Sequence, residues 1–281
     1  MYESHFGLQE KPFALTPDPA FLFRSRHHDF GLMALEYGVL SNAGFSLLTG
    51  DVGSGKTMLI RKLLAGLGNE FRVGLISNTN RNFGGLLQWI CLAFELDYRD
   101  KTLAGLYEQF VNLLTTEYAA GRRVLLIVDE AQNLSPQLLE ELRVLSNVNA
   151  DKNMVLQTIL VGQPELRDVL RQPSLRQFAQ RISSEYHLQG LRQADALQYV
   201  RHRLQVAGGS PDLISPEAVD LAWQFSGGIP RLMNQLCDLA LVYAFGDGLP
   251  IVDLQTMQGV VDDRRAGGLW QQELALVSHA Q

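Results

Sequence analysis

The chain has 281 residues, of which 46% are hydrophobic and 19% charged, with a formal net charge of −6. This composition excludes wholesale disorder and a dominant basic surface of the kind that binds nucleic acid, although it allows a local basic patch on one face. No apolar run approaches the roughly 18 residues that span a bilayer, and the N-terminus lacks the apolar core of a signal peptide. We therefore expect a cytoplasmic protein, whose attachment to a membrane would need a partner or a short amphipathic segment. Two cysteines in apolar stretches, Cys91 and Cys237, fit buried free thiols.

Short apolar runs alternate with helical patterns over the first two thirds of the chain. The expected strands are Phe45–Thr49, Val73–Ser77, Val124–Val128, Val155–Val161 and Ile182–Leu188. The expected helices between them are His28–Leu40, Met58–Leu67, Phe83–Phe94, Leu103–Tyr118 and one that begins at Ser135-Pro136. This alternation predicts an α/β fold with a parallel sheet covered by helices on both faces.

The alternation stops near Gly190, and the pattern from Gln193 to Asp262 is helical only, interrupted by glycine turns. This change predicts a second, smaller all-helical domain. The expected divisions are an N-terminal arm and helix at 1–40, a core at 41–190, a helical domain at 191–262 and a mobile tail at 263–281.

The segment Gly50–Thr57 matches the pattern G-x-x-x-x-G-K-[ST] in full, after a predicted strand and at the start of a predicted helix. Glycines allow the tight turn that points successive N–H groups at phosphate oxygens, and the helix N-terminus adds partial positive charge. Lys56 is expected to reach the β- and γ-phosphates, and the Thr57 hydroxyl to bind Mg²⁺. The sequence thus predicts a site for ATP and Mg²⁺, with these nucleotide-binding residues: Gly50, Asp51, Val52, Gly53, Ser54, Gly55, Lys56, Thr57 and Met58.

Two adjacent carboxylates, Asp129 and Glu130, follow the buried strand Val124–Val128. Ligands in parallel sheets bind at the carboxyl ends of strands, so these side chains and the phosphate loop can share one edge. We expect Asp129 to hold Mg²⁺ and Glu130 to act as the general base that polarises the attacking water. The following Ala131-Gln132-Asn133 can help to orient water, but a turn role is favoured.

Four further polar residues are candidates for contacts with the γ-phosphate. Gln163 ends the fourth strand, where the alternative role is a cap or turn. Arg176 and Arg181 precede the fifth strand, and Arg231 follows a glycine-proline turn in the helical domain. An arginine supplied by a neighbouring subunit stabilises transition-state charge in related chemistry, although most arginines are solvated surface residues. The proline- and aromatic-rich arm has two alternatives: packing on the core, or a lid over the adenine ring.

In their order along the chain, these residues resemble the AAA+ ATPases. The resemblance implies a three-layer α-β-α P-loop core with a five-stranded parallel sheet, followed by a small helical lid. It assigns Lys56 and Thr57 to the Walker A motif and Asp129 and Glu130 to Walker B. It also assigns Gln163 to sensor 1, Arg231 to sensor 2, and Arg181, with Arg176 as second choice, to the arginine finger.

A narrower resemblance covers about residues 1–262. The arm and several later motifs look like the general secretion pathway protein A type ATPases, including those associated with exosortase and exopolysaccharide loci. The motifs that carry it are Phe6-Gly7-Leu8, Lys11-Pro12-Phe13, Asp129-Glu130-Ala131-Gln132-Asn133-Leu134, Gly162-Gln163-Pro164-Glu165-Leu166 and Gly228-Ile229-Pro230-Arg231-Leu232-Met233-Asn234. Full-length secretion members continue into a transmembrane helix and a periplasmic domain. Since the chain ends at Gln281 with neither, we expect a stand-alone relative or a piece of a longer protein.

The resemblance implies a ring-like homo-oligomer that hydrolyses ATP to drive or regulate assembly of an envelope secretion or polysaccharide-export system. The alternative is a nucleotide-switched DNA-binding regulator of the transposition target-selection type, which needs a basic surface on the assembled oligomer. A third alternative is an ATP-binding scaffold with negligible turnover, against which the intact Glu130 argues.

Overall fold

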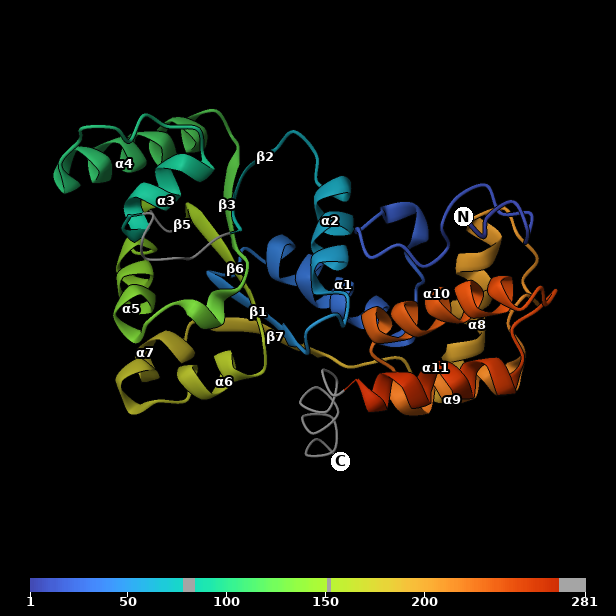
Figure 1. Ribbon diagram of the computed structural model, residues 1–281. Helices are drawn as coiled ribbons and strands as arrows, with labels where there is room; N and C mark the ends of the chain where they lie inside the picture. Colours follow the sequence, from blue (N-terminus) through green and yellow to red (C-terminus); the bar gives the residue numbers. More distant parts are fainter. Residues whose placement is uncertain (78–83, 151–152, 268–281) are drawn as a thin grey trace. The chain divides into compact units, whose positions relative to one another are not determined.

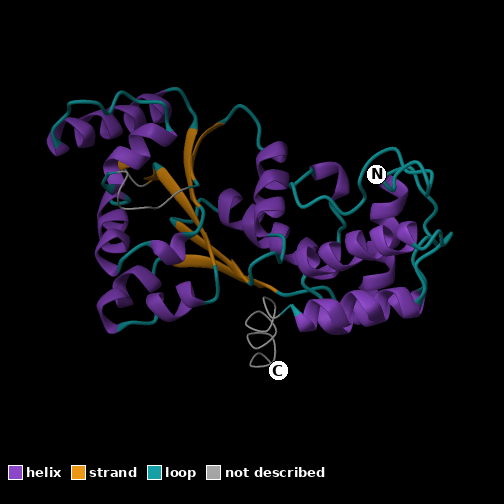
Figure 2. Ribbon diagram, in the orientation of Figure 1, coloured by secondary structure: helices purple, strands orange, loops and turns teal. Residues whose placement is uncertain are grey.

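Five parallel strands form the central sheet of the protein, whose computed structural model describes residues 1–77, 84–150 and 153–267. The strand order is β2-β3-β6-β1-β7, and the strands are drawn in orange in Figure 2. The bounds are β1 (Phe45–Gly50), β2 (Phe71–Ile76), β3 (Arg123–Val128), β6 (Leu156–Gly162) and β7 (Ile182–Leu188). All five predicted strands are confirmed. A short antiparallel pair, β4 (Asn149–Ala150) and β5 (Asn153–Met154), was not predicted.

The chain divides into two compact units. The sheet unit comprises residues 30–50 and 59–188, and the helical unit comprises residues 1–29, 51–58 and the described residues from 189 onward. Helices α1 (Arg26–Leu40) and α2 (Lys56–Gly66) contribute residues to both units. From Asp51 onward, the phosphate loop thus groups with the helical unit. The boundaries predicted from the sequence place it in the core at 41–190 instead.

The sheet unit has three layers because its strands bury alternate residues on opposite faces (Figure 1). Val124, Leu126 and Val128 of β3 pack with the helices on one face, and Leu125 and Ile127 pack against α1 and α2 on the other. The helices of the first face are α3 (Leu86–Ala93), α4 (Leu103–Ala119), α5 (Pro136–Leu145), α6 (Glu165–Leu170) and α7 (Arg176–Ala179). This arrangement confirms the predicted three-layer α-β-α fold. The expected helix at Phe83–Phe94 begins at Leu86, and Phe83 lies outside the described residues.

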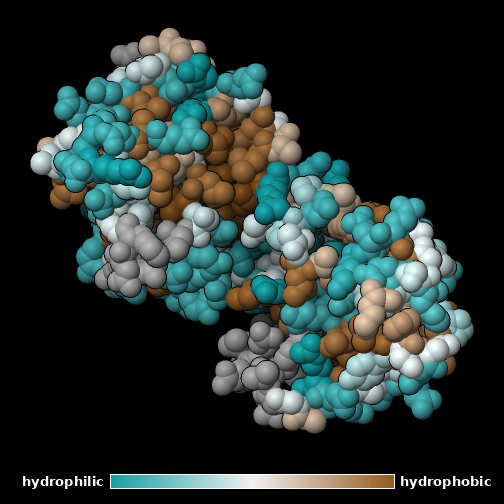
Figure 3. Space-filling view, turned by 45° about the horizontal axis from the view of Figure 1, so that its top comes forward, coloured by the Kyte–Doolittle hydropathy of each residue, from teal (hydrophilic) through white to brown (hydrophobic). Residues whose placement is uncertain are grey.

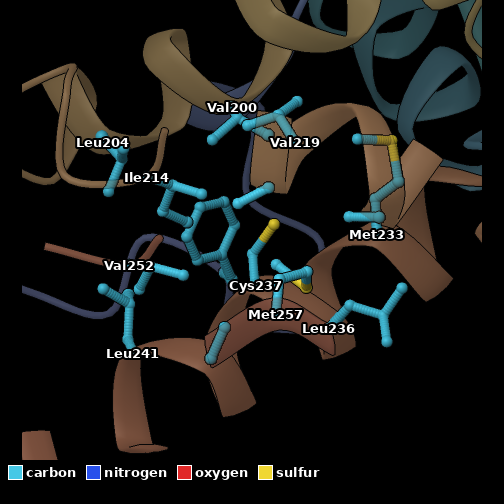
Figure 4. Packing of buried hydrophobic residues seen from close by; sticks show 14 of the residues in the cluster. Val200, Leu204, Ile214, Val219, Met233, Leu236, Cys237, Leu241, Val252 and Met257 are labelled. Carbon is cyan, nitrogen blue, oxygen red and sulfur yellow. The ribbon is translucent and has the colours of Figure 1, made fainter. Parts of the chain in front are cut away.

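The helical unit is built on four helices: α8 (Gln193–Val206), α9 (Pro216–Ser226), α10 (Pro230–Gly246) and α11 (Leu254–Ala266). Their apolar faces form one core around the buried thiol of Cys237 (Figure 4). Burial raises the pKa of this thiol to about 12, as expected for an inert core cysteine. Cys91 is buried and free in the sheet unit, which confirms the reading of both cysteines as free thiols. The expected mobile tail lies, from residue 268 on, outside the described residues.

The N-terminal arm is part of the helical unit's core. Its buried aromatic side chains pack among residues of α8 to α11; they are Tyr2, Phe6, Phe13 and Phe21. The buried guanidinium of Arg203 in α8 also holds the arm in place. Its Nε donates to the Pro12 carbonyl at 2.6 Å, and its Nη2 donates to the Ala14 carbonyl at 3.3 Å. The same guanidinium lies 4.8 Å from the centre of the Phe21 ring, within cation–π range.

We expect Arg203→Leu to lower the free energy of unfolding of the helical unit by about 2–4 kcal/mol, because the buried Pro12 carbonyl and the less buried Ala14 carbonyl lose a charged donor. Chemical denaturation followed by circular dichroism measures this loss. Chymotrypsin should also cut the arm faster, at Phe13 or Phe21.

The matched control is Arg201→Leu, on the same helix, which removes a partly exposed ion pair with Asp212. Its expected cost is below about 1 kcal/mol. Equal effects of the two substitutions would show that Arg203 does not fasten the arm.

Candidate functional site

The phosphate loop follows β1 directly and leads into α2. The Ser54 N–H donates to the Asp51 carbonyl at 3.1 Å, which closes a turn. The Lys56 ammonium donates to the same carbonyl at 2.9 Å, and only 8% of this residue is exposed. Val52 and Thr57 are exposed, and Met58 is half-buried. The lysine is thus held within the loop at the point where α2 begins.

Two glycines of the loop have backbone conformations and surroundings that exclude side chains. Gly53 has φ of +83° and Gly55 has φ of +105°, in a region that glycine adopts readily and other residues rarely do. A Cβ at Gly53 would lie 2.4 Å from the Arg231 Cβ, and one at Gly55 would lie 2.7 Å from Nε2 of His28. The glycines therefore serve both the turn and the close approach of two neighbouring segments.

The first of these segments is the start of α10. The Arg231 N–H donates to the Gly53 carbonyl at 3.2 Å, while the Arg231 side chain is exposed. The preceding turn is held by the Leu191 N–H, which donates to the Gly228 carbonyl at 2.7 Å. Gly228 has no room for a Cβ, which would lie 2.2 Å from the Leu191 carbonyl oxygen. The glycine-proline turn thus brings the backbone of Arg231 to the phosphate loop.

The second segment is the start of α1, where His28 is buried against the loop. Nε2 of His28 lies 3.2 Å from the Ser54 carbonyl, and Nδ1 lies 2.7 Å from the Ser25 hydroxyl. Because a carbonyl only accepts, Nε2 carries the hydrogen and donates to Ser54. Desolvation lowers the pKa of His28, which favours the neutral ring. His28 is not among the site residues predicted from the sequence, because no motif marks it.

The acidic end of β3 lies in the sheet unit. The Asp129 N–H donates to the Ile76 carbonyl of β2 at 2.8 Å, so the pairing of the strands extends to this residue. Asp129 Oδ1 accepts from the Glu130 N–H at 2.9 Å. Glu130 has φ of +52°, a left-handed conformation that is uncommon outside glycine and costs backbone energy. The chain thus turns sharply as soon as the buried strand ends.

Three polar side chains meet at this turn. Gln132 donates from Nε2 to Glu130 Oε2 at 2.6 Å, and its Oε1 accepts from the Gln163 N–H at 3.0 Å. Gln163 donates from Nε2 to Glu130 Oε2 at 3.4 Å. A Cβ at Gly162 would lie 2.9 Å from Gln132 Oε1, so the glycine makes room for this approach. Gln132, for which the sequence favoured a turn role, connects the carboxylate that follows β3 with the residue that follows β6.

The two arginines before β7 differ in their surroundings. Arg181 is half-buried, and its Nη1 donates to the Arg143 carbonyl at 3.3 Å and to the Ser146 hydroxyl at 3.1 Å, both in its own chain. Arg176 is the first residue of α7 and is exposed. Arg181 thus bonds within its own chain, and Arg176, the second choice for the arginine finger, is the more accessible of the two.

The predicted site residues fall into two sets, one in each unit. The phosphate loop from Asp51 onward and Arg231 belong to the helical unit, and Asp129, Glu130 and Gln163 belong to the sheet unit. Each set forms a local arrangement suited to one part of a nucleotide. The glycine turn and the start of α2 suit phosphate oxygens. Hard oxygen donors for a divalent cation come from Thr57 in the first set and Asp129 in the second.

Residues 39–170 match the AAA domain family. Over 278 residues the chain is 44% identical to general secretion pathway protein A of Aeromonas hydrophila. That alignment covers 98% of the chain and 51% of the relative, so the chain spans about half the length of the curated protein that it matches.

Solved structures with the same fold include the ORC2 protein of Aeropyrum pernix in ADPNP and ADP complexes, at 18% identity and a TM-score of 0.68. The match covers 95% of this chain and 74% of that one. The ORC1 protein of Aeropyrum pernix in complex with DNA matches at 16% identity and a TM-score of 0.62, over 90% and 69% of the two chains. At these identities the likeness concerns the fold alone. The chain thus carries a match to the AAA domain family over residues 39–170 and is similar over almost its whole length to general secretion pathway protein A.

Proposed function

We propose that the protein binds Mg-ATP at Gly50–Thr57 and hydrolyses it with Glu130 as general base. The observation that carries this proposal is the side-chain cluster of Glu130, Gln132 and Gln163 at the strand ends, in a chain whose loop after β1 has the glycine turn that phosphates require. Strands β3, β6 and β1 are parallel and adjacent in one sheet. The loop follows the carboxyl end of β1 and the acidic pair follows the carboxyl end of β3, so both follow strands that end at the same edge of the sheet.

The residues divide the chemistry between them. Lys56 would exchange its contact with the Asp51 carbonyl for phosphate oxygens. Glu130 would accept the proton of the attacking water, while Gln132 holds its carboxylate in place. Gln163 is hydrogen-bonded to both Glu130 and Gln132, so a contact between Gln163 and the γ-phosphate would be transmitted to these two side chains. Arg231 would approach the same phosphate from the start of α10.

Mg²⁺ fits the donors that the chain offers. Thr57 supplies a hydroxyl and Asp129 a carboxylate, and the half-buried Asp129 is held by its backbone bond to β2. When bound, the ion would supply positive charge opposite the phosphate oxygens. We assign Thr57 and Asp129 as its protein ligands.

Lys56→Ala should abolish nucleotide binding, since the loop then lacks its one formal positive charge. Titration calorimetry with a slowly hydrolysed ATP analogue, with Mg²⁺, measures the affinity. Retained micromolar affinity would overturn the assignment of the phosphate loop.

Glu130→Gln should keep the ATP analogue bound but lower turnover by about 100-fold or more, because the general base is lost. Gln132→Ala should lower turnover by about tenfold, the effect of losing one hydrogen bond to a charged group. The matched control is Asn133→Ala, the exposed next residue, which should leave turnover unchanged. Turnover near the wild-type rate in Glu130→Gln would exclude Glu130 as the base.

Self-association is part of the proposal, with Arg176 or Arg181 reaching the site of a neighbouring subunit. An apolar stripe on α1 supports it: Phe30, Met33, Tyr37 and Leu40 are 43 to 71% exposed and lie three or four residues apart. Apolar surface also gathers in places among the hydrophilic residues of the face drawn in Figure 3. Exposed apolar surface of this kind is typical of protein interfaces.

The pathway is proposed from the similarity to general secretion pathway protein A. We propose that the protein drives or regulates assembly of an envelope secretion or polysaccharide-export system, from the cytoplasmic side of the inner membrane. Within the described part of the chain, none of the helices has the length and apolar character that a membrane crossing requires. A DNA-binding regulator is the second candidate, because a solved structure with this fold is in complex with DNA.

Turnover per subunit, measured against protein concentration with and without DNA, distinguishes the two candidates. Turnover that rises with concentration and ignores DNA is the expected result, because the arginine acts from a neighbouring subunit. Stimulation by DNA that fades as salt is added would favour the DNA-binding regulator, since phosphate contacts release counterions.

A further inference from the structure

We infer that His28 is a positioning residue for nucleotide binding, because its imidazole holds the backbone of the phosphate loop through the Ser54 carbonyl. This inference rests on the proposed function of that loop. The His28 ring bonds the Ser54 carbonyl and the Ser25 hydroxyl. Neither of these bonds involves Lys56 or Thr57, the loop residues assigned to phosphate and Mg²⁺ chemistry. Its proposed effect therefore passes through the loop backbone.

The imidazole is joined to the loop by one hydrogen bond and lies close to one of its glycines. Nε2 donates to the Ser54 carbonyl at 3.2 Å, and a Cβ added to Gly55 would lie 2.7 Å from the same atom. The ring thus occupies the space beside Gly55, whose φ of +105° is required by the turn. The Ser54 carbonyl and the Gly55 N–H belong to one planar trans peptide and point in opposite directions. Holding the carbonyl toward His28 therefore points the Gly55 N–H away from His28. That N–H is among the donors that the glycine turn offers to phosphate.

The imidazole is itself held in one tautomer. With Nε2 as donor and the ring neutral, Nδ1 accepts from the Ser25 hydroxyl at 2.7 Å. The Ser25 carbonyl also accepts from the Asp29 N–H at 2.9 Å, which orders the first turn of α1 around the histidine. His28 is 6% exposed, so water competes little for these bonds.

The arm connects this contact to the rest of the helical unit. The segment that ends at Ser25 is fastened upstream by the Arg203 guanidinium and by the buried Phe21. The loop is also bonded to Arg231 of α10. The phosphate loop is therefore held by two segments of the helical unit that lie about 200 positions apart in the sequence.

Three substitutions of His28 test the inference. His28→Leu fills the space but has no donor, and it should weaken binding of the ATP analogue by about fivefold or more, the equivalent of one net hydrogen bond. His28→Gln, whose amide can occupy the place of Nε2, should restore affinity to within about twofold of wild type. His28→Asn, whose amide stops short, should bind as weakly as His28→Leu.

The matched control is His5→Leu. His5 belongs to the same arm and also donates from Nε2 to a backbone carbonyl, that of Leu249 at 3.0 Å, but it does not bond the loop. It should leave affinity unchanged. The melting temperature of each variant without nucleotide shows whether the loss of affinity exceeds a general loss of stability. If the leucine variant does not fold, the comparison of ATP-analogue affinity between His28→Asn and His28→Gln tests the inference.

The outcomes separate the inference from the proposed function. Wild-type affinity in both His28→Leu and His28→Asn, or equal weakness of His28→Gln and His28→Asn, would overturn the role of His28 while Lys56→Ala still fails to bind. Absence of binding by the wild-type protein would overturn the proposed function and, with it, this inference.

Discussion

The phosphate loop depends on two hydrogen bonds to its backbone carbonyls whose donors lie outside the loop. Gly53 and Gly55 adopt positive φ, and glycine loses more conformational freedom on folding than any other residue. A loop of this composition needs neighbours to hold its shape. His28 bonds the Ser54 carbonyl and Arg231 bonds the Gly53 carbonyl, each beside a glycine that has no room for a Cβ. The start of α1 and the start of α10 thereby become parts of the proposed nucleotide site.

The sheet supplies the second half of the chemistry through a different constraint. Strand β3 is buried except at its first residue, and directly after it Glu130 turns into a left-handed conformation. The energetic cost of this turn is offset by two local hydrogen bonds. The Glu130 N–H donates to Asp129 Oδ1, and Gln132 Nε2 donates to Glu130 Oε2. Backbone strain clusters at functional sites, and Glu130 has a proposed catalytic role. The strained turn fits a Glu130 side chain that must point in a defined direction.

Much of the fold was predictable because its signals are local. The continuous apolar run at Val124–Val128, the glycine-lysine pattern at Gly50–Thr57 and the serine-proline helix start at Ser135 each follow from a few adjacent residues. The grouping of the arm with the helical unit was not predictable in this way. It depends on hydrogen bonds from Arg203 to the Pro12 and Ala14 carbonyls, which lie 191 and 189 positions away in the sequence.

The candidate site shows the same division. Lys56, Asp129 and Glu130 could be named from motifs, because their spacing from a strand end is characteristic. His28 and the bridging role of Gln132 could not, since each depends on contacts between segments remote in sequence. The preference for Arg181 over Arg176 rested on resemblance alone, and the bonds of Arg181 to Arg143 and Ser146 now weigh against it.

Hydrogen exchange of the backbone amides, with and without a slowly hydrolysed ATP analogue, tests the central claim most directly. The account predicts that the nucleotide slows exchange in residues 51–58 and, together with them, in residues 25–29 and 229–233, because all three segments are bonded at the loop. Protection confined to other parts of the chain, or protection of 51–58 without any change at 25–29 and 229–233, would contradict it.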